Sequence, residues 1–276
     1  MRLSRLCVVA SVGLVAATLS PVASAHGNVL AGEGAHAPIW LSQGLFVVAW
    51  LTYVIGAARR SPGLQRQLLF HGAMALTGFA LFGPFDEWAD SSTAMHMAQH
   101  MLLIVGVAPL AVLARPLPQW RACIGRAADI VWRPLLRASH HPSACALLHA
   151  AAIWIWHAPG PYMAAVTDNW LHVAEHASFL LTGWLFWWSV LRAGRQDALA
   201  AALALLFTAT HTGMLGALLT FAGQPLYIQE SQDLWDQQLA GLIMWIPGGG
   251  IYLLAAAWAG YRWLSQAHAK ALSEGA

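Results

Sequence analysis

The chain has little charge. Only 9% of its 276 residues are charged and 58% are hydrophobic, whereas a typical soluble domain carries about 25% charged residues. This deficit excludes an ordinary soluble fold and predicts an all-α, polytopic membrane helix bundle. The formal charge of +2 decides little by itself, because the positions of the charges set the orientation of a membrane chain.

Cysteine is also scarce. The three cysteines, Cys7, Cys123 and Cys145, are far apart and form no C-x-x-C pair, which excludes a disulfide framework and a cysteine metal site. The sequence offers no Ser-His-Asp arrangement, phosphate loop or pair of catalytic acids that can be placed on one face. We therefore predict a protein that is not an enzyme, with the lipid bilayer around it and no nucleic-acid partner.

The first segment resembles a secretory signal. Residues 1–25 contain two early arginines, an apolar stretch over Leu6–Leu19 and a final A-x-A, which predicts a removable signal peptide, with an uncleaved first span as the alternative. Cleavage after Ala25 would place His26 at the amino terminus, where its amine and imidazole can bind copper together. Residues 26–276 are predicted to form one transmembrane domain.

Seven apolar runs follow, each near the ~20 residues that a helix needs to cross a membrane. The second and fourth are short. We predict seven transmembrane helices at about 38–58, 67–84, 94–114, 143–158, 171–191, 198–221 and 239–259.

The basic residues predict the orientation. All Lys and Arg residues after the signal segment fall between runs one and two, three and four, and five and six, or after run seven. The positive-inside rule makes these segments cytoplasmic, including the basic loop at 115–142. The amino terminus is then outside and the carboxyl terminus inside. The outer loops carry only acidic charges.

Five histidines are expected in the outer third of the membrane. Runs three and five each carry a pair spaced i, i+4, which places both imidazoles on one helical face about 6 Å apart along the axis. Ionisable side chains are rare in spans and usually face the bundle interior or a functional pathway. We predict that the two pairs form a metal site with help from run four, and interior hydrogen bonding is the alternative. The residues are His96, His100, His172 and His176, with His157 assisting.

His211 and Met214, in run six, lie deeper and are predicted as secondary ligands at best. Imidazole suits copper, zinc and iron, and the nearby thioethers of Met97 and Met101 shift the preference towards Cu(I). Copper is therefore the predicted cofactor. Two alternatives stay open: a b-type haem clamped by two histidines, and a copper transporter whose pathway the histidines line.

Two other features accompany the histidines. Glu175 either accepts the ring N–H of a ligating histidine or reaches the water interface. Pro247 and the three glycines after it lie in the middle of run seven. They predict a kinked or locally open helix, or close packing on a neighbour.

An ordered set of motifs resembles the multi-span, CtaG-like cytochrome c oxidase assembly factors, over about Trp40 to Trp263. This family is distinct from the single-span copper chaperone that shares its name. The motifs are MHMAQHMLLIVGVAPL (95–110), WHAPGPY (156–162), LHVAEHASFLLTGWLFWW (171–188), GALLTF (216–221) and DQQLAGLIMWIPGG (236–249).

The resemblance implies a non-enzymatic role in maturing the haem–copper oxidase, by handling copper on the outer side of a bacterial plasma membrane. The partners it implies are cytochrome c oxidase subunits and a periplasmic copper chaperone. It does not supply a ligand map, so the histidine assignment rests on depth and spacing.

Overall fold

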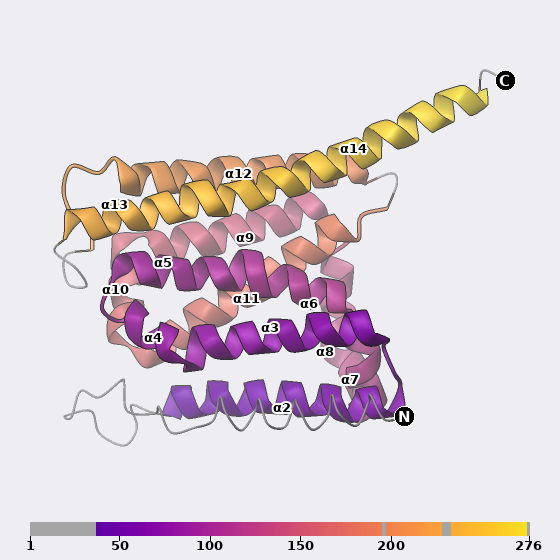
Figure 1. Ribbon diagram of the computed structural model, residues 1–276, viewed down its shortest axis with the longest axis horizontal. Helices are drawn as coiled ribbons and strands as arrows, with labels where there is room; N and C mark the ends of the chain where they lie inside the picture. The colour runs from indigo at the N-terminus through magenta and orange to yellow at the C-terminus, as the bar shows by residue number, and fades with distance from the viewer. Residues whose placement is uncertain (1–36, 195–196, 228–232, 275–276) are drawn as a thin grey trace.

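The computed structural model describes residues 37–194, 197–227 and 233–274, and over these residues the chain is all-α (Figure 1). The predicted signal peptide and His26 lie outside the described residues.

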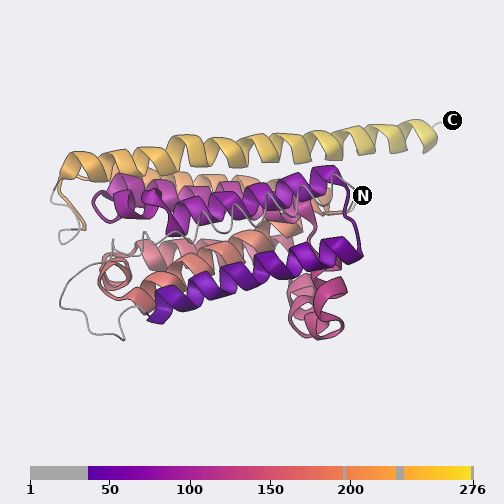
Figure 2. The same cartoon turned by 60° about the horizontal axis from the view of Figure 1, so that its bottom comes forward.

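The chain has a long helical segment at each of the seven predicted runs, and these segments lie side by side (Figures 1 and 2). The last one extends to Glu274, well beyond the predicted run. The uninterrupted ones are α2 (Ala37–Arg59), α3 (Leu64–Phe82), α9 (Pro142–His157), α11 (Asn169–Leu191) and α12 (Ala198–Thr220). The other two are composite: α5 (Thr93–Met101), η2 (Leu102–Val107) and α6 (Ala108–Ala114), then α13 (Leu234–Ile243), η3 (Met244–Gly248) and α14 (Gly249–Glu274).

Four helical segments in the described part of the chain are long and apolar enough to cross a membrane. They are Ala37–Arg59, Thr93–Ala114, Ala198–Thr220 and Leu234–Ser265. The helix α9 has only 16 residues, and α11 carries His172, Glu175 and His176, which lower its mean hydropathy. The structure therefore shows an all-α bundle with four candidate membrane spans, which supports a multi-pass membrane protein, while seven spans and their orientation stay predictions.

Short helices close the two ends of the bundle. The helices α4 (Pro84–Ala89) and α10 (Pro159–Thr167) lie at one end, and α7 (Leu117–Ile124) and α8 (Ala127–Ala138) lie at the other (Figure 1). The predicted basic loop is therefore largely helical. Within it, Asp129 lies 3.2 Å from both Arg121 and Arg133.

Two π-helical segments interrupt long helices. The segment η3 contains Pro247, whose ring removes a backbone donor and disturbs the α-helical hydrogen bonding. The segment η2 begins two residues after His100, and the buried indole of Trp187 donates a hydrogen bond to its Ile104 carbonyl at 2.8 Å. Such π-helical turns occur often at functional sites.

Glycine lets α13 and η3 approach their neighbours. A Cβ added to Gly241 would lie 2.5 Å from the carbonyl oxygen of Gly216 on α12. A Cβ added to Gly248 would lie 2.8 Å from the Met101 sulfur on α5. Small residues of this kind let membrane helices pack backbone to backbone, so the break in run seven coincides with close packing.

Candidate metal centre

The first half of the centre is on α5, whose start is held by another helix. Asp236 on α13 accepts hydrogen bonds from the Ser92 hydroxyl at 2.7 Å and from the Thr93 amide at 2.6 Å. The Ser92 side chain also caps α5 by accepting from the Met95 amide at 3.2 Å. A carboxylate at a helix N-terminus is favoured by the helix dipole, and here it fixes the segment that carries the first histidine pair.

The second half is on α11. Asp168 caps this helix by accepting from the amides of Trp170 and Leu171. The cap is followed by His172, Glu175 and His176, which the i, i+3, i+4 spacing places on one helical face.

Four side chains from these two helices converge on one point. A nitrogen from each of His96, His100 and His176 and an oxygen of Glu175 all lie within 4.8 Å of one another, and all four residues are buried. Glu175 has no exposed surface, and its two oxygens lie 3.7 Å from Nε2 of His100 and 3.9 Å from Nε2 of His96. The ring centroids of His100 and His176 are 5.2 Å apart.

Several imidazole nitrogens in this group make no hydrogen bond. Within the described residues, three of these nitrogens have no hydrogen-bond partner: Nδ1 and Nε2 of His100, and Nε2 of His176. Buried polar atoms are satisfied in the great majority of cases, and exceptions need an explanation such as an ion. Three imidazoles and a carboxylate can therefore hold a metal ion here.

His157 approaches from the end of α9. Its Nδ1 lies 2.7 Å from the Ile153 carbonyl, to which it can only donate. The proton on Nδ1 leaves Nε2 with the lone pair, and Nε2 lies 3.2 Å from the Met97 sulfur. A nitrogen and a thioether thus lie beside the four-residue group, and the His157 ring centroid is 5.9 Å from that of His100.

His172 lies at the edge of the group. Its ring stacks on His96 with centroids 5.6 Å apart and contacts His176 edge-on at 4.4 Å. Like His176, it also lines a cavity that borders the cluster. The structure therefore brings all five predicted outer histidines together, with His172 on the cavity side.

The two deeper residues are not brought into this group. His211 is buried on α12 with its ring against Phe207. The Met214 side chain is 52% exposed, which places it on an outer face of the bundle.

Glu175 is the residue that sequence reasoning left undecided. One alternative placed it beside a ligating histidine and the other placed it at the water interface. The structure buries it within the group of histidines. Its position three residues after His172 and directly before His176 was the available signal, since it shares their helical face.

Two tyrosines join the cluster to its surroundings. The Tyr162 hydroxyl lies 3.4 Å from Nδ1 of His96. Tyr162 stacks on Tyr227, whose hydroxyl donates to the His157 carbonyl at 2.8 Å. Both rings are buried, so they add a rigid, dry boundary next to His96 and His157.

A family model for the cytochrome c oxidase caa3 assembly factor (Caa3_CtaG) matches residues 46–266. The chain belongs to this assembly-factor family. The match confirms the predicted resemblance and spans every residue of the candidate metal centre. No curated protein and no solved structure matches the chain. Membership in the caa3 assembly factor family relates the chain to oxidase assembly and implies a non-catalytic role.

Proposed function

We propose that the chain binds copper through His96, His100, His176 and Glu175, and handles it as cargo for maturation of the haem–copper oxidase. The observation that carries this proposal is the convergence of four buried donor atoms within 4.8 Å. The family description supports the role in oxidase assembly, and the donor group supports metal binding. His157, Met97 and His172 would assist at the margin of the site.

The spacing of the donors fits one ion. Nitrogen and oxygen ligands lie about 2.0–2.2 Å from a metal such as zinc, and in a tetrahedral site they are therefore about 3.3–3.6 Å apart. Donors that already lie within 4.8 Å need only small side-chain movements to reach such a geometry. The Glu175 charge, buried in a membrane bundle, also favours a cation among the imidazoles.

The donor types support copper. Imidazole suits copper, zinc and iron, and a thioether favours Cu(I). The Met97 sulfur lies 3.2 Å from Nε2 of His157, so a soft thioether and a further imidazole lie beside the four-residue group. Among these metals, copper is the one that a haem–copper oxidase holds outside its haems.

The ring contacts support a metal ion over a haem. The His100 and His176 rings meet edge-on, with their planes at 74° and their centroids 5.2 Å apart. A haem would have to lie between its two ligand rings, and here Glu175 already lies near both.

In the proposed topology the seven helical segments all span a bacterial plasma membrane, with the amino terminus outside. The centre then lies near the end of the bundle that holds α4 and α10, on the outer side, where a periplasmic chaperone could deliver copper and a nascent oxidase subunit could receive it. A copper transporter is the second candidate. The two π-helical segments favour it, because broken helices often line transport pathways.

A complementation experiment tests the assembly role. Cells lacking the gene should show a reduced oxidase copper content, restored by the wild-type chain and not by His100→Ala, at equal protein level. Met214→Leu, with its exposed side chain, is the matched control and should restore it. Full rescue by His100→Ala would contradict the proposal. Copper uptake by proteoliposomes, with normal oxidase assembly in the deletion strain, would favour the transporter.

A further inference from the structure

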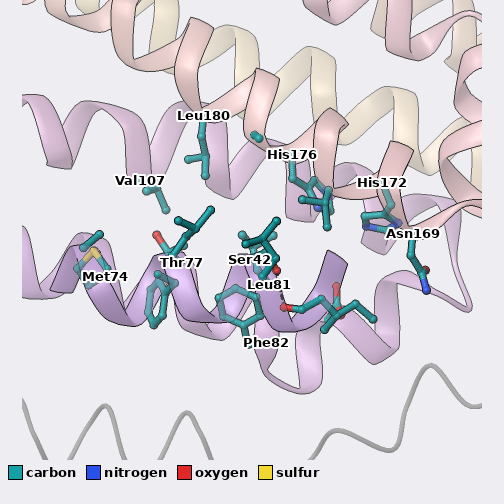
Figure 3. A pocket seen from close by; sticks show the side chains of 18 residues that line it. Ser42, Met74, Thr77, Leu81, Phe82, Val107, Asn169, His172, His176 and Leu180 are labelled. Atoms are coloured by element: carbon teal, nitrogen blue, oxygen red, sulfur yellow. Dashed lines mark hydrogen bonds between the residues drawn. The ribbon is translucent and has the colours of Figure 1, made fainter. Parts of the chain in front are cut away.

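A cavity of about 390 Å³ lies between α2, α3 and α11 and reaches the histidine cluster. Figure 3 shows Met74 towards one end of it and Asn169 with His172 towards the other. Apolar side chains such as Phe46, Leu81 and Leu180 line its body. The cavity is therefore amphipathic along its length, with an apolar body and a polar end.

The first half of α2 leaves room for the cavity beside it, because the contacts that hold α2 against α3 and α7 are mainly in its second half. There the Trp50 indole donates to His71 at 3.0 Å, Tyr53 stacks on Phe70, and the Trp120 indole donates to the Ala49 carbonyl at 2.9 Å. The cavity residues of α2 run from Ile39 to Ala49, and all of them except Ala49 belong to its first half.

The cavity faces the surroundings of the bundle. Leu41 and Leu45 line it and are nevertheless 51% and 62% exposed. The helix α2 meets the length and composition of a membrane span, and in the proposed topology the surroundings at this point are lipid. A molecule dissolved in the bilayer could enter sideways without crossing water.

The charges of the lining select the head group. Among the described residues, no lysine or arginine lines the cavity, and the one carboxylate of its lining, Asp86, accepts a hydrogen bond from Gln99 at 2.7 Å. A phosphate head would find no cationic partner there. The Asn169 amide and the His172 imidazole at the polar end of the lining can bond to a neutral oxygen-bearing head.

We infer that this cavity binds one neutral, chain-bearing amphiphile from the membrane, with its oxygen-bearing head against Asn169 and His172 and its tail along the apolar body. The volume is within the range of small-molecule sites, about 300–1,000 Å³, and is too small for a transmembrane helix of a partner. A prenylated quinone and an acylglycerol share this chemistry. The inference goes beyond copper handling and does not require a bound metal.

Equilibrium binding to the full-length protein in phosphatidylcholine nanodiscs tests this inference. The probes are radiolabelled decyl-benzoquinone and dioctanoylglycerol. We expect saturable binding of at least one probe at one site per chain, and the probe that binds identifies the source of the natural ligand. Saturable binding of neither probe would overturn the inference, and so would displacement only by phosphatidylglycerol.

Two variants locate the binding. Ala177→Phe on α11 and Leu81→Trp on α3 both fill the cavity and should weaken binding at least tenfold. Ala174→Phe is the matched control, because Ala174 is exposed on the same helix and does not line the cavity. It should bind like the wild type. Unchanged affinity in both filled variants would overturn the inference.

Copper content, measured on the same samples, keeps the two proposals apart. Probe binding should persist in His100→Ala, whose side chain does not line the cavity. Copper content that is normal in Ala177→Phe, together with lost probe binding, would show that the cavity and the metal centre are separate sites.

Discussion

The Oε1 atom of Glu175 lies 3.7 Å from Nε2 of His100, and neither side chain has any exposed surface. The two residues come from different helices, α11 and α5, and both belong to the four-residue donor group. A carboxylate in this position is costly in a membrane bundle unless positive charge lies beside it. The relationship between Glu175 and His100 therefore connects the packing of the two helices to the chemistry of the site.

Glu175→Gln tests that connection. The amide keeps the size of the side chain and removes its charge, so copper affinity should fall at least about tenfold, the lower end of the loss seen when groups supporting a metal site are removed. A competition titration with a chelator measures the change. Glu87→Gln, at an exposed position on α4, is the control and should bind as the wild type does. Equal affinity of the two variants would contradict a role for Glu175.

Met97 and Met214, two of the three methionines considered in the sequence analysis, should behave differently. Met214 is 52% exposed, so Met214→Leu should leave copper affinity unchanged and stability within about 0.5 kcal/mol. Met97 is fully buried, with its sulfur 3.2 Å from His157, so Met97→Leu should weaken Cu(I) binding. Parallel Cu(I) titrations compare them. Weaker binding by Met214→Leu would restore it as a ligand candidate.

Asp236 should stabilise the start of α5. Asp236→Ala removes the acceptor for the Ser92 hydroxyl and the Thr93 amide, and hydrogen bonds to a charged group contribute about 1.5–3 kcal/mol each. The melting temperature in detergent should therefore fall clearly. Asp236→Asn keeps one acceptor oxygen, so its melting temperature should fall less. A melting temperature for Asp236→Ala equal to that of the wild type would refute this role.

Gly241 should tolerate no side chain. A Cβ there would meet the Gly216 carbonyl at 2.5 Å and the Thr220 amide at 2.6 Å, and overpacking costs about 1–3 kcal/mol. Gly241→Ala should lower the melting temperature. Gly249→Ala adds the same methyl group where nothing lies within 4 Å, and it should not lower the melting temperature. Equal melting temperatures would show that α12 and α13 can separate at little cost.

The sequence predicted the helices well because their lengths follow from the apolar runs. The structure has a helix at each of the seven predicted segments. The sequence analysis did not predict α4, α7 and α10, because helices of six to nine residues leave little periodic signal. It also missed α8, although these 12 residues are strongly amphipathic, because the arginines led the segment to be interpreted as a basic loop. The π-helical segment η2 was also missed, since Leu102–Val107 is apolar throughout and contains no proline.

The site was predictable in depth and not in detail. Loop charges placed five histidines at one level, and the structure brings them together. Which of them share one ion depends on the rotation of α5 and α11 about their axes, and tertiary packing sets this rotation. His172 therefore lies at the edge of the group, and Glu175 lies inside it. The i, i+3, i+4 spacing alone could not show which of these two residues takes the inner position.

Metal analysis of the purified full-length protein tests the central claim most directly. The wild type should bind one copper ion per chain without a Soret band, and the combined variant His100→Ala and His176→Ala should bind none while keeping its helical circular dichroism. Stoichiometric copper in the folded double variant, or a Soret band with stoichiometric iron in the wild type, would contradict the account.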